Sequence, residues 1–195
     1  MKKVTLLFLL AVTLLFGFNQ EDYDRLIKSG TCQNCDLSGA DLSNMDLSMS
    51  ELQNANLKGA NLYNSNLFEA DLSGANLENA MFWKADLSFS LLNKVHAGGV
   101  NLKGANLTNA VLSDGNFTRS ISWKANFSNA KIDKCDFSLS ELGDAVFDEN
   151  DLRNSIFDEA ILWKAHFKNV KLTKKQCKHA KEEEAIIESE ASCEE

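Results

Sequence analysis

The hydrophobic pattern along this chain has a period of five residues. From Leu37 to Leu172 every fifth position is a centre of the pattern, and the 28 centres are 18 Leu, 7 Phe and 1 Ile, with only Ala97 and Ser122 departing. Two residues before each centre the chain is almost always small, most often Ala or Ser. Neither an α-helix, with a period of about 3.6, nor a flat strand, with a period of about 2, gives this spacing. A short repeat kept over this length predicts a solenoid.

Within each five-residue unit, the centre and the small residue are expected to point inward. In residues 75–79, for example, Ala75 and Leu77 should face the core, while Asn76 and Glu78 flank the centre and should face solvent. Full burial of one Leu or Phe side chain contributes about 1.5–3 kcal/mol. The repeated centres therefore outweigh any surface detail in deciding the fold. Small partners are needed because the interior of a narrow coil is crowded.

The letters of the repeat resemble a known motif. Stretches such as CDLSGADLSNMDLS, NANLKGANLYNSNL and ADLSGANLENA are similar to the A(D/N)LXX unit of the pentapeptide-repeat family, and the resemblance covers residues 35–174. It implies an all-β solenoid, a right-handed quadrilateral β-helix with four pentapeptides in each coil. The 140 residues of the block then make about seven coils (140/20).

Both ends of such a rod need covering, because a bare end exposes the core and the strand edges. We expect a short helix over residues 21–28, with Leu26 and Ile27 facing inward. Thr173 is the expected N-cap of a C-terminal helix that runs to Glu190, and the final acidic stretch should fray into solvent. The predicted division is a signal peptide at 1–18, an N-terminal cap at 19–34, the pentapeptide-repeat β-helix at 35–174, and a C-terminal helix with an acidic tail at 175–195.

The first residues are typical of an export signal. Residues 1–3 are Met-Lys-Lys, and residues 4–18 are apolar apart from two Thr and one Gly. That apolar stretch is shorter than the ~20 residues that a membrane-spanning helix needs, which favours a signal peptide. The mature protein is then expected to be secreted or periplasmic in a bacterium. No Ala-x-Ala cleavage site is present, so an uncleaved membrane anchor is the alternative.

Five cysteines follow the predicted signal, and export would permit disulfides. Cys32 and Cys35 form a CxxC motif without the βαβ context of a thioredoxin, so we expect a local disulfide at the mouth of the solenoid rather than a redox site. Cys177 and Cys193 flank the C-terminal helical segment and could also pair. Cys135 takes a small inward position, which predicts a packing thiol.

A second, longer period overlies the first. Trp83, Trp123 and Trp163 are evenly spaced, eight pentapeptides apart, and each is followed by Lys. With four pentapeptides in a coil, this spacing makes two coils, so the set should lie on one side of the rod with a Trp every ~10 Å. Each Trp follows a centre and should face outward. The candidate binding stripe comprises Tyr63, Met81, Trp83, Lys84, Ile121, Trp123, Lys124, Ile161, Trp163 and Lys164.

Two interpretations of this stripe compete. A duplicated two-coil unit would leave a structural ladder, in which each Trp stacks on the neighbouring coil. Alternatively, a contiguous exposed apolar surface marks a binding site, for which rigid and amphipathic Trp and Tyr are well suited. The partner would then be another protein, a second copy of the rod, or a glycan stacked on the rings.

The charge and the remaining residues favour binding over catalysis. The net charge of −8 argues against broad binding to nucleic acid or to an anionic membrane, because either would need a basic stripe. Only three His are present, and no Ser/His/Asp set or metal-ligand spacing stands out, so no catalytic residue, metal or cofactor is expected. The sequence therefore predicts an exported, non-catalytic scaffold or protein-interaction module.

The family resemblance also suggests an alternative function. Some pentapeptide-repeat proteins are acidic DNA mimics that bind the topoisomerase gyrase and protect it from inhibitors. That function needs a cytoplasmic protein with a strongly acidic rod. Residues 35–174 hold 18 acidic and 13 basic residues, a net charge of −5 (13 − 18). The export signal and this modest charge favour the scaffold.

Overall fold

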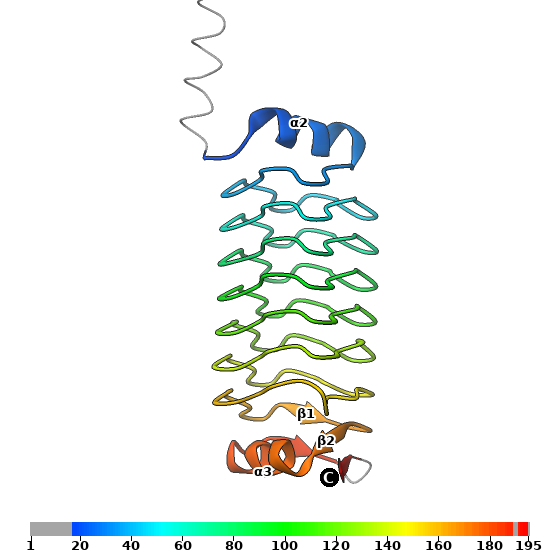
Figure 1. Ribbon diagram of the computed structural model, residues 1–195, viewed down its shortest axis with the longest axis vertical. Coiled ribbons are helices and arrows are strands. Elements are labelled where there is room, and N and C mark those ends of the chain that lie inside the picture. Colours follow the sequence, from blue (N-terminus) through cyan, green and yellow to red (C-terminus); the bar gives the residue numbers. More distant parts are fainter. Residues whose placement is uncertain (1–16, 189–190, 195) are drawn as a thin grey trace, which may run out of the picture.

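The computed structural model, which describes residues 17–188 and 191–194, is a rod of stacked coils (Figure 1). Parallel β-bridges join each position to its counterpart four pentapeptides later, from the pair Thr31 and Glu51 to the pair Asp151 and Lys171. Four such ladders run along the rod, so each coil has four sides of five residues. The structure thus has the predicted pentapeptide solenoid. Most of the predicted signal peptide, residues 1–16, lies outside the described residues.

The corners of the coils explain the polar half of the repeat. Two residues after the centre, the backbone enters the left-handed region, as at Asn44 with a φ of 59°. Asn and Gly tolerate that region best, which accounts for their frequency there. Before the centre, a carboxylate or amide accepts a hydrogen bond from the turn, as Asp41 does from the backbone N–H of Ser43 at 3.1 Å. The Asn and Asp residues of the repeat therefore either form the turns or, from their places in the ladders, cap them with their side chains.

The core consists of the buried centres and their small partners. From Phe117 to Phe167 every second centre is Phe, and the rings stack from coil to coil with centroids 4.9–5.4 Å apart. A Cβ at Gly115 would lie 2.5 Å from the ring of Phe117, so the smallest residue stands where this ring needs room. The two stacks are Phe117, Phe137 and Phe157, and Phe127, Phe147 and Phe167.

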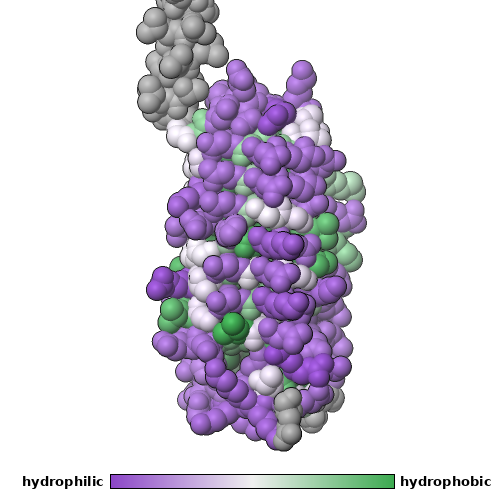
Figure 2. Space-filling view, viewed as in Figure 1, coloured by the Kyte–Doolittle hydropathy of each residue, from purple (hydrophilic) through white to green (hydrophobic). Residues whose placement is uncertain are grey.

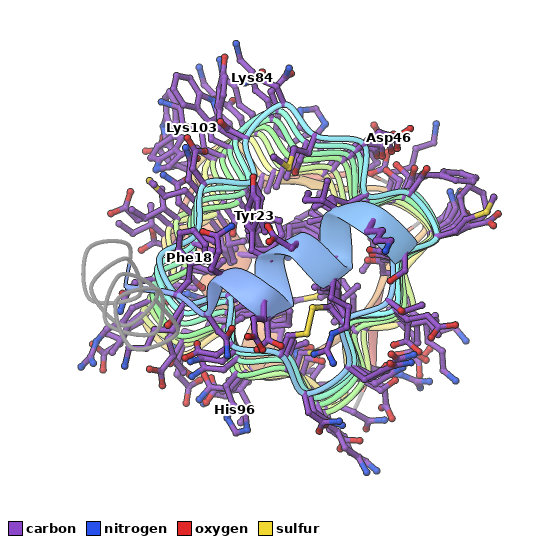
Figure 3. All side chains as sticks on the ribbon, turned by 90° about the horizontal axis from the view of Figure 1, so that it is seen from above. Phe18, Tyr23, Asp46, Lys84, His96 and Lys103 are labelled. Carbon is purple, nitrogen blue, oxygen red and sulfur yellow. A yellow bond between two sulfur atoms is a disulfide. The ribbon has the colours of Figure 1, made fainter. Side chains whose placement is uncertain are left out.

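Helix α2 (Gln20–Ser29) lies across the first coil (Figures 1 and 3). It begins at Asn19, whose side chain accepts hydrogen bonds from two N–H groups of the first turn. Leu26 is buried against the core, but Ile27 is 52% exposed. The prediction that both face inward is wrong for Ile27, because successive residues of a helix point about 100° apart and one short helix buries only one face.

Helix α3 (Lys174–Glu182) covers the other end of the core (Figure 1). It begins after Thr173, as predicted, and Thr173 and Gln176 form a capping box. The helix does not run to Glu190 but ends at Glu182, so this part of the prediction is wrong. Because α3 is short, the rest of the chain is free to return to the solenoid.

In its described residues the acidic tail does not fray but continues the ladders, which corrects the prediction that it frays into solvent. Strand β3 (Ile186–Ile187) pairs in parallel with β1 (His166–Phe167), and Ile186 stands opposite His166, in step with the ladders. Strand β4 (Ser192–Glu194) pairs in parallel with β2 (Lys171–Thr173), but Ser192 stands opposite Lys171, one position out of step. The tail therefore forms two sides of one more coil, and α3 stands in for the other two.

One rung of the ladders is interrupted in the described part of the chain. No bridge joins Lys131 to Asp151 there. Asn150 takes a small inward position, and its side-chain amide donates to the carbonyls of Phe127 and Ala130, at 3.2 Å each. In the other coils, a backbone N–H from the next coil donates to the carbonyl at the position of Ala130. At Ala130 the side-chain amide of Asn150 therefore replaces the backbone hydrogen bond between the two coils.

Candidate functional site

The residues predicted to form a stripe lie on one side of the rod. Along the third ladder, Met81, Asn101, Ile121, Glu141 and Ile161 bridge one another in that order. The three apolar members are 44%, 36% and 44% exposed, in the order of the sequence. The structure therefore brings these apolar residues together in one row, with a polar residue between each pair.

The aromatic residues follow two positions further along each coil. We call Tyr63, Trp83, Trp123 and Trp163 the aromatic stripe. Trp83 is 42% exposed and Trp163 is 39% exposed, whereas Trp123 is half-buried. Ring centroids lie 5.2 Å apart for Tyr63 and Trp83, and 6.2 Å apart for Trp123 and Trp163. For Trp123 and Trp163 the expectation of one ring every ~10 Å is therefore wrong, because these two rings come into contact.

Gly143 explains why Trp123 reaches Trp163. A Cβ at position 143 would overlap the six-membered ring of Trp123, so the indole lies directly on the glycine backbone. Its Nε1–H donates to Glu141 Oε2 at 2.8 Å, which fixes the orientation of the ring. Gly143 was not predicted as a site residue. The sequence signal was available, because 143 lies midway between the two Trp positions.

Three lysines surround the rings. Lys84 Nζ lies 5.2 Å and Lys103 Nζ lies 6.0 Å from the Trp83 ring centroid, and Lys164 Nζ lies 4.2 Å from that of Trp163. These are cation–π distances. Lys84 and Lys103 project from the same side of the rod (Figure 3). Sequence reasoning missed Lys103, because it stands in the coil between two Trp coils and so falls outside the longer period.

The cysteines lie away from the stripe and show no reactive thiol. Cys32 is joined to Cys35 by a disulfide beneath α2, and Cys177 is joined to Cys193 by one that ties α3 to β4. Cys135 is a buried free thiol. Burial raises the pKa of Cys135 to about 12, because the thiolate would lose its hydration. At neutral pH this thiol therefore stays protonated and acts as packing.

The rest of the described surface offers little chemistry. A groove of about 710 Å³ lies between α3 and the last coil, and its opposite charges pair with each other, as Lys175 and Asp158 do at 2.6 Å. His96 projects from another side of the rod than Lys84 (Figure 3). Among the described residues, no group of three or more His, Cys, Asp or Glu side chains could hold a metal ion. No helix in residues 17–188 and 191–194 is long and apolar enough to cross a membrane.

The four ladders and the five-residue register define a β-helical repeat protein. The family model of pentapeptide repeats matches residues 35–74, 70–109, 85–121 and 135–173, in eight copies. These segments cover more than half of the chain. The chain therefore belongs to the pentapeptide-repeat family. No curated protein matches it.

Several solved structures are similar to this chain. HetL, a pentapeptide repeat protein involved in heterocyst differentiation regulation from the cyanobacterium Nostoc sp. strain PCC 7120, is 28% identical, with 72% of this chain and 73% of HetL covered and a TM-score of 0.46. QnrB1, a plasmid-mediated fluoroquinolone resistance protein, is 20% identical, with 78% and 71% covered and a TM-score of 0.44. A pentapeptide repeat protein from the Arabidopsis thaliana thylakoid lumen is 34% identical, with 54% and 67% covered and a TM-score of 0.28.

Proposed function

We propose that this protein is an exported, non-catalytic scaffold or protein-interaction module that binds its partner through the aromatic stripe. The observation that carries the proposal is the exposure of Trp83 and Trp163, at 42% and 39%, in one row along the rod. Large aromatic side chains dominate interface energetics when they are buried by a partner. The surface in Figure 2 is mostly hydrophilic, with hydrophobic side chains as separate spots.

The rings are already held in place, which favours binding. Trp123 is oriented by Gly143 below it and by Glu141 at its Nε1–H, and it contacts Trp163. A side chain that is ordered before binding loses little conformational entropy on binding. A purely structural ladder would also order the rings, but it would not need to leave about two-fifths of Trp83 and of Trp163 exposed. The arrangement therefore supports a binding surface that the fold has organised in advance.

Export is supported by the sequence and is compatible with the cysteines. Residues 1–18 have the basic and apolar pattern of a signal peptide. Two disulfides, Cys32–Cys35 and Cys177–Cys193, suit an oxidising compartment. A secreted or periplasmic location follows from the proposal. Family membership supports a non-catalytic role, because the repeat residues are accounted for as packing and corners.

Affinity capture from cell-envelope extracts tests this function. The wild-type protein should retain a partner that the triple variant Trp83→Ser, Trp123→Ser, Trp163→Ser loses, while circular dichroism shows both proteins folded. The matched control replaces exposed apolar residues in other columns and should retain the partner. The proposal would be contradicted if the Trp variant captured the partner equally well. It would also be contradicted if cell fractionation found the full-length protein in the cytosol. The control positions are Met49, Phe89 and Leu139, which are 66%, 50% and 44% exposed.

A further inference from the structure

We infer that the aromatic stripe is a track for a linear anionic polysaccharide, whose sugar rings stack on the indoles and whose carboxylates pair with the flanking lysines. This inference rests on the proposed function, because it takes the stripe to be the binding surface. It deepens that function by naming the chemical class of the partner.

The first argument is that Trp123 forms a flat platform. One part of its ring lies on the Gly143 backbone, and Glu141 holds the indole N–H. The Trp123 side chain is half-buried, so part of it stays open to solvent. The C–H face of a pyranose is apolar and flat, and it is complementary to such a ring. The stripe residues line neither the groove beside α3 nor the smaller one beneath α2.

The second argument is the straightness of the row. The four rings stand at 63, 83, 123 and 163, positions that differ by whole coils. They form the pair Tyr63 and Trp83 and the pair Trp123 and Trp163, with Lys103 in the coil between them. A row of rings along several coils, tilted by 58° and 55° within the two pairs, fits an extended and twisting chain of sugars better than a compact ligand.

The third argument is the local charge. Between residues 81 and 164 the stripe columns carry four amines, whereas the rod as a whole has a net charge of −5 (13 − 18). Two carboxylates lie in the same part of these columns, Glu141 and Asp144, and Glu141 is already bonded to Trp123. An acidic rod with a basic aromatic strip is complementary to a polymer that combines negative charge with apolar ring faces. The four amines belong to Lys84, Lys103, Lys124 and Lys164.

The lysines are also placed to act together with the rings. Lys84 and Lys164 each approach the ring of the Trp directly before them, with Nζ at 5.2 and 4.2 Å from its centroid. A sugar that stacks on that face of the ring would displace the amine from it, and a carboxylate of the sugar could then pair with the displaced amine. Single-stranded nucleic acid combines stacking with negative charge as well, so the test below includes it as a competing ligand.

Binding of the exported protein to polygalacturonate at low ionic strength tests the inference. The readouts are Trp fluorescence and affinity electrophoresis. We expect retardation and a fluorescence change for the wild type. Trp123→Ala should weaken binding about tenfold, and Trp123→Phe, which keeps a flat ring, should weaken it less. Replacing Lys84, Lys103 and Lys164 by Gln should also cost about tenfold and reduce the salt dependence.

Matched controls separate stacking from charge. Replacing Lys94, Lys131 and Lys171, which stand in other columns, by Gln should leave binding within about twofold. A neutral galactan, poly-glutamate and oligo-dT should each bind more weakly than polygalacturonate. The inference is overturned if poly-glutamate, oligo-dT or the galactan binds equally well, or if the wild type binds no polygalacturonate. If that binding is absent while Trp-dependent capture from envelope extracts persists, the proposed function stands and only the polysaccharide is wrong.

Discussion

Gly143 is the position where the smallest change should disturb the candidate site most. In Gly143→Ala the new Cβ would overlap Cζ3, Cε3 and Cη2 of Trp123, so the indole must swing away. It then loses the ring contact with Trp163, worth about 0.5–1.5 kcal/mol. It also loses the hydrogen bond to Glu141, worth about 0.5–1.5 kcal/mol.

The two losses oppose one gain. Replacing glycine by alanine where the backbone allows it stabilises a protein by about 0.4–1 kcal/mol through the unfolded state. Set against a summed loss of about 1–3 kcal/mol, this leaves a net destabilisation of about 1.3 kcal/mol at the midpoints of the two ranges for Gly143→Ala. Urea unfolding followed by far-ultraviolet circular dichroism measures that difference, and near-ultraviolet circular dichroism reports whether the Trp123 ring has left its partner.

Two controls make this prediction refutable. At Gly98 a new Cβ would meet nothing closer than Thr118 Oγ1 at 3.8 Å, so Gly98→Ala should be neutral or slightly stabilising. In a Trp123→Ala background the cost of Gly143→Ala should vanish, because no ring is left to displace. The steric reasoning fails if Gly143→Ala costs the same with and without the Trp123 ring.

Three further predictions concern the ends, the corners and the pH dependence of the rod. Removing the second disulfide with Cys177→Ser and Cys193→Ser should lower the free energy of unfolding by about 3 kcal/mol. Protease should then cleave the tail before it cleaves the coils. A tail as resistant to protease as in the wild type would contradict this. Met49 is 66% exposed and has a φ of 57°, a backbone conformation that glycine adopts without strain. Met49→Gly should therefore raise the free energy of unfolding by up to about 1 kcal/mol, measured by urea unfolding. A lower free energy of unfolding would show that the Met49 side chain contributes more than its backbone strain costs. Burial raises the pKa of Asp71, but hydrogen bonds, those from Ser73 foremost, outweigh it and hold the pKa below its usual 3.8. The ionised Asp71 therefore stabilises the fold above that value, and the contribution is lost as the pH falls through the lower folded pKa. In Asp71→Asn the urea midpoint should therefore fall less steeply as the pH is lowered into the acid range. If the fall is unchanged, it is due to other carboxylates.

The sequence predicts the body of the rod well because every unit solves the same packing problem. A Leu such as Leu77 and a small residue such as Ala75 have the same neighbours in each coil, so one burial argument serves all 28 units. A register error would expose every centre at once. The period therefore predicts both the fold and the facing of almost every residue.

The ends were harder to predict because no repeat supports them. The step from Lys171 to its partner Ser192 is one residue longer than a coil and breaks the pentapeptide register, and only the pairing with the last coil shows that the tail belongs to the ladders. The apolar pair Ile186 and Ile187 was assigned to a helix, although β-branched residues side by side also suit a strand. Local pattern cannot choose between these when the partner strand lies a whole coil earlier in the chain.

The sequence predicts which residues form the aromatic stripe but not which rings contact each other. The packing that decides these ring contacts also explains why the Trp residues are two coils apart. Each side chain at this corner leans onto the next coil, only ~4.8 Å away, and an indole is too large to share that space with another ring lying flat. Where rings do stand in successive coils, as Tyr63 and Trp83 do, they are tilted by 58°. Trp123 lies on its neighbour only because that neighbour is Gly143. A Trp that lies flat therefore requires a small or flexible residue in the following coil, and this alternation makes the period two coils rather than one. Duplication accounts for the repeat, but steric exclusion is what would keep the alternation in place.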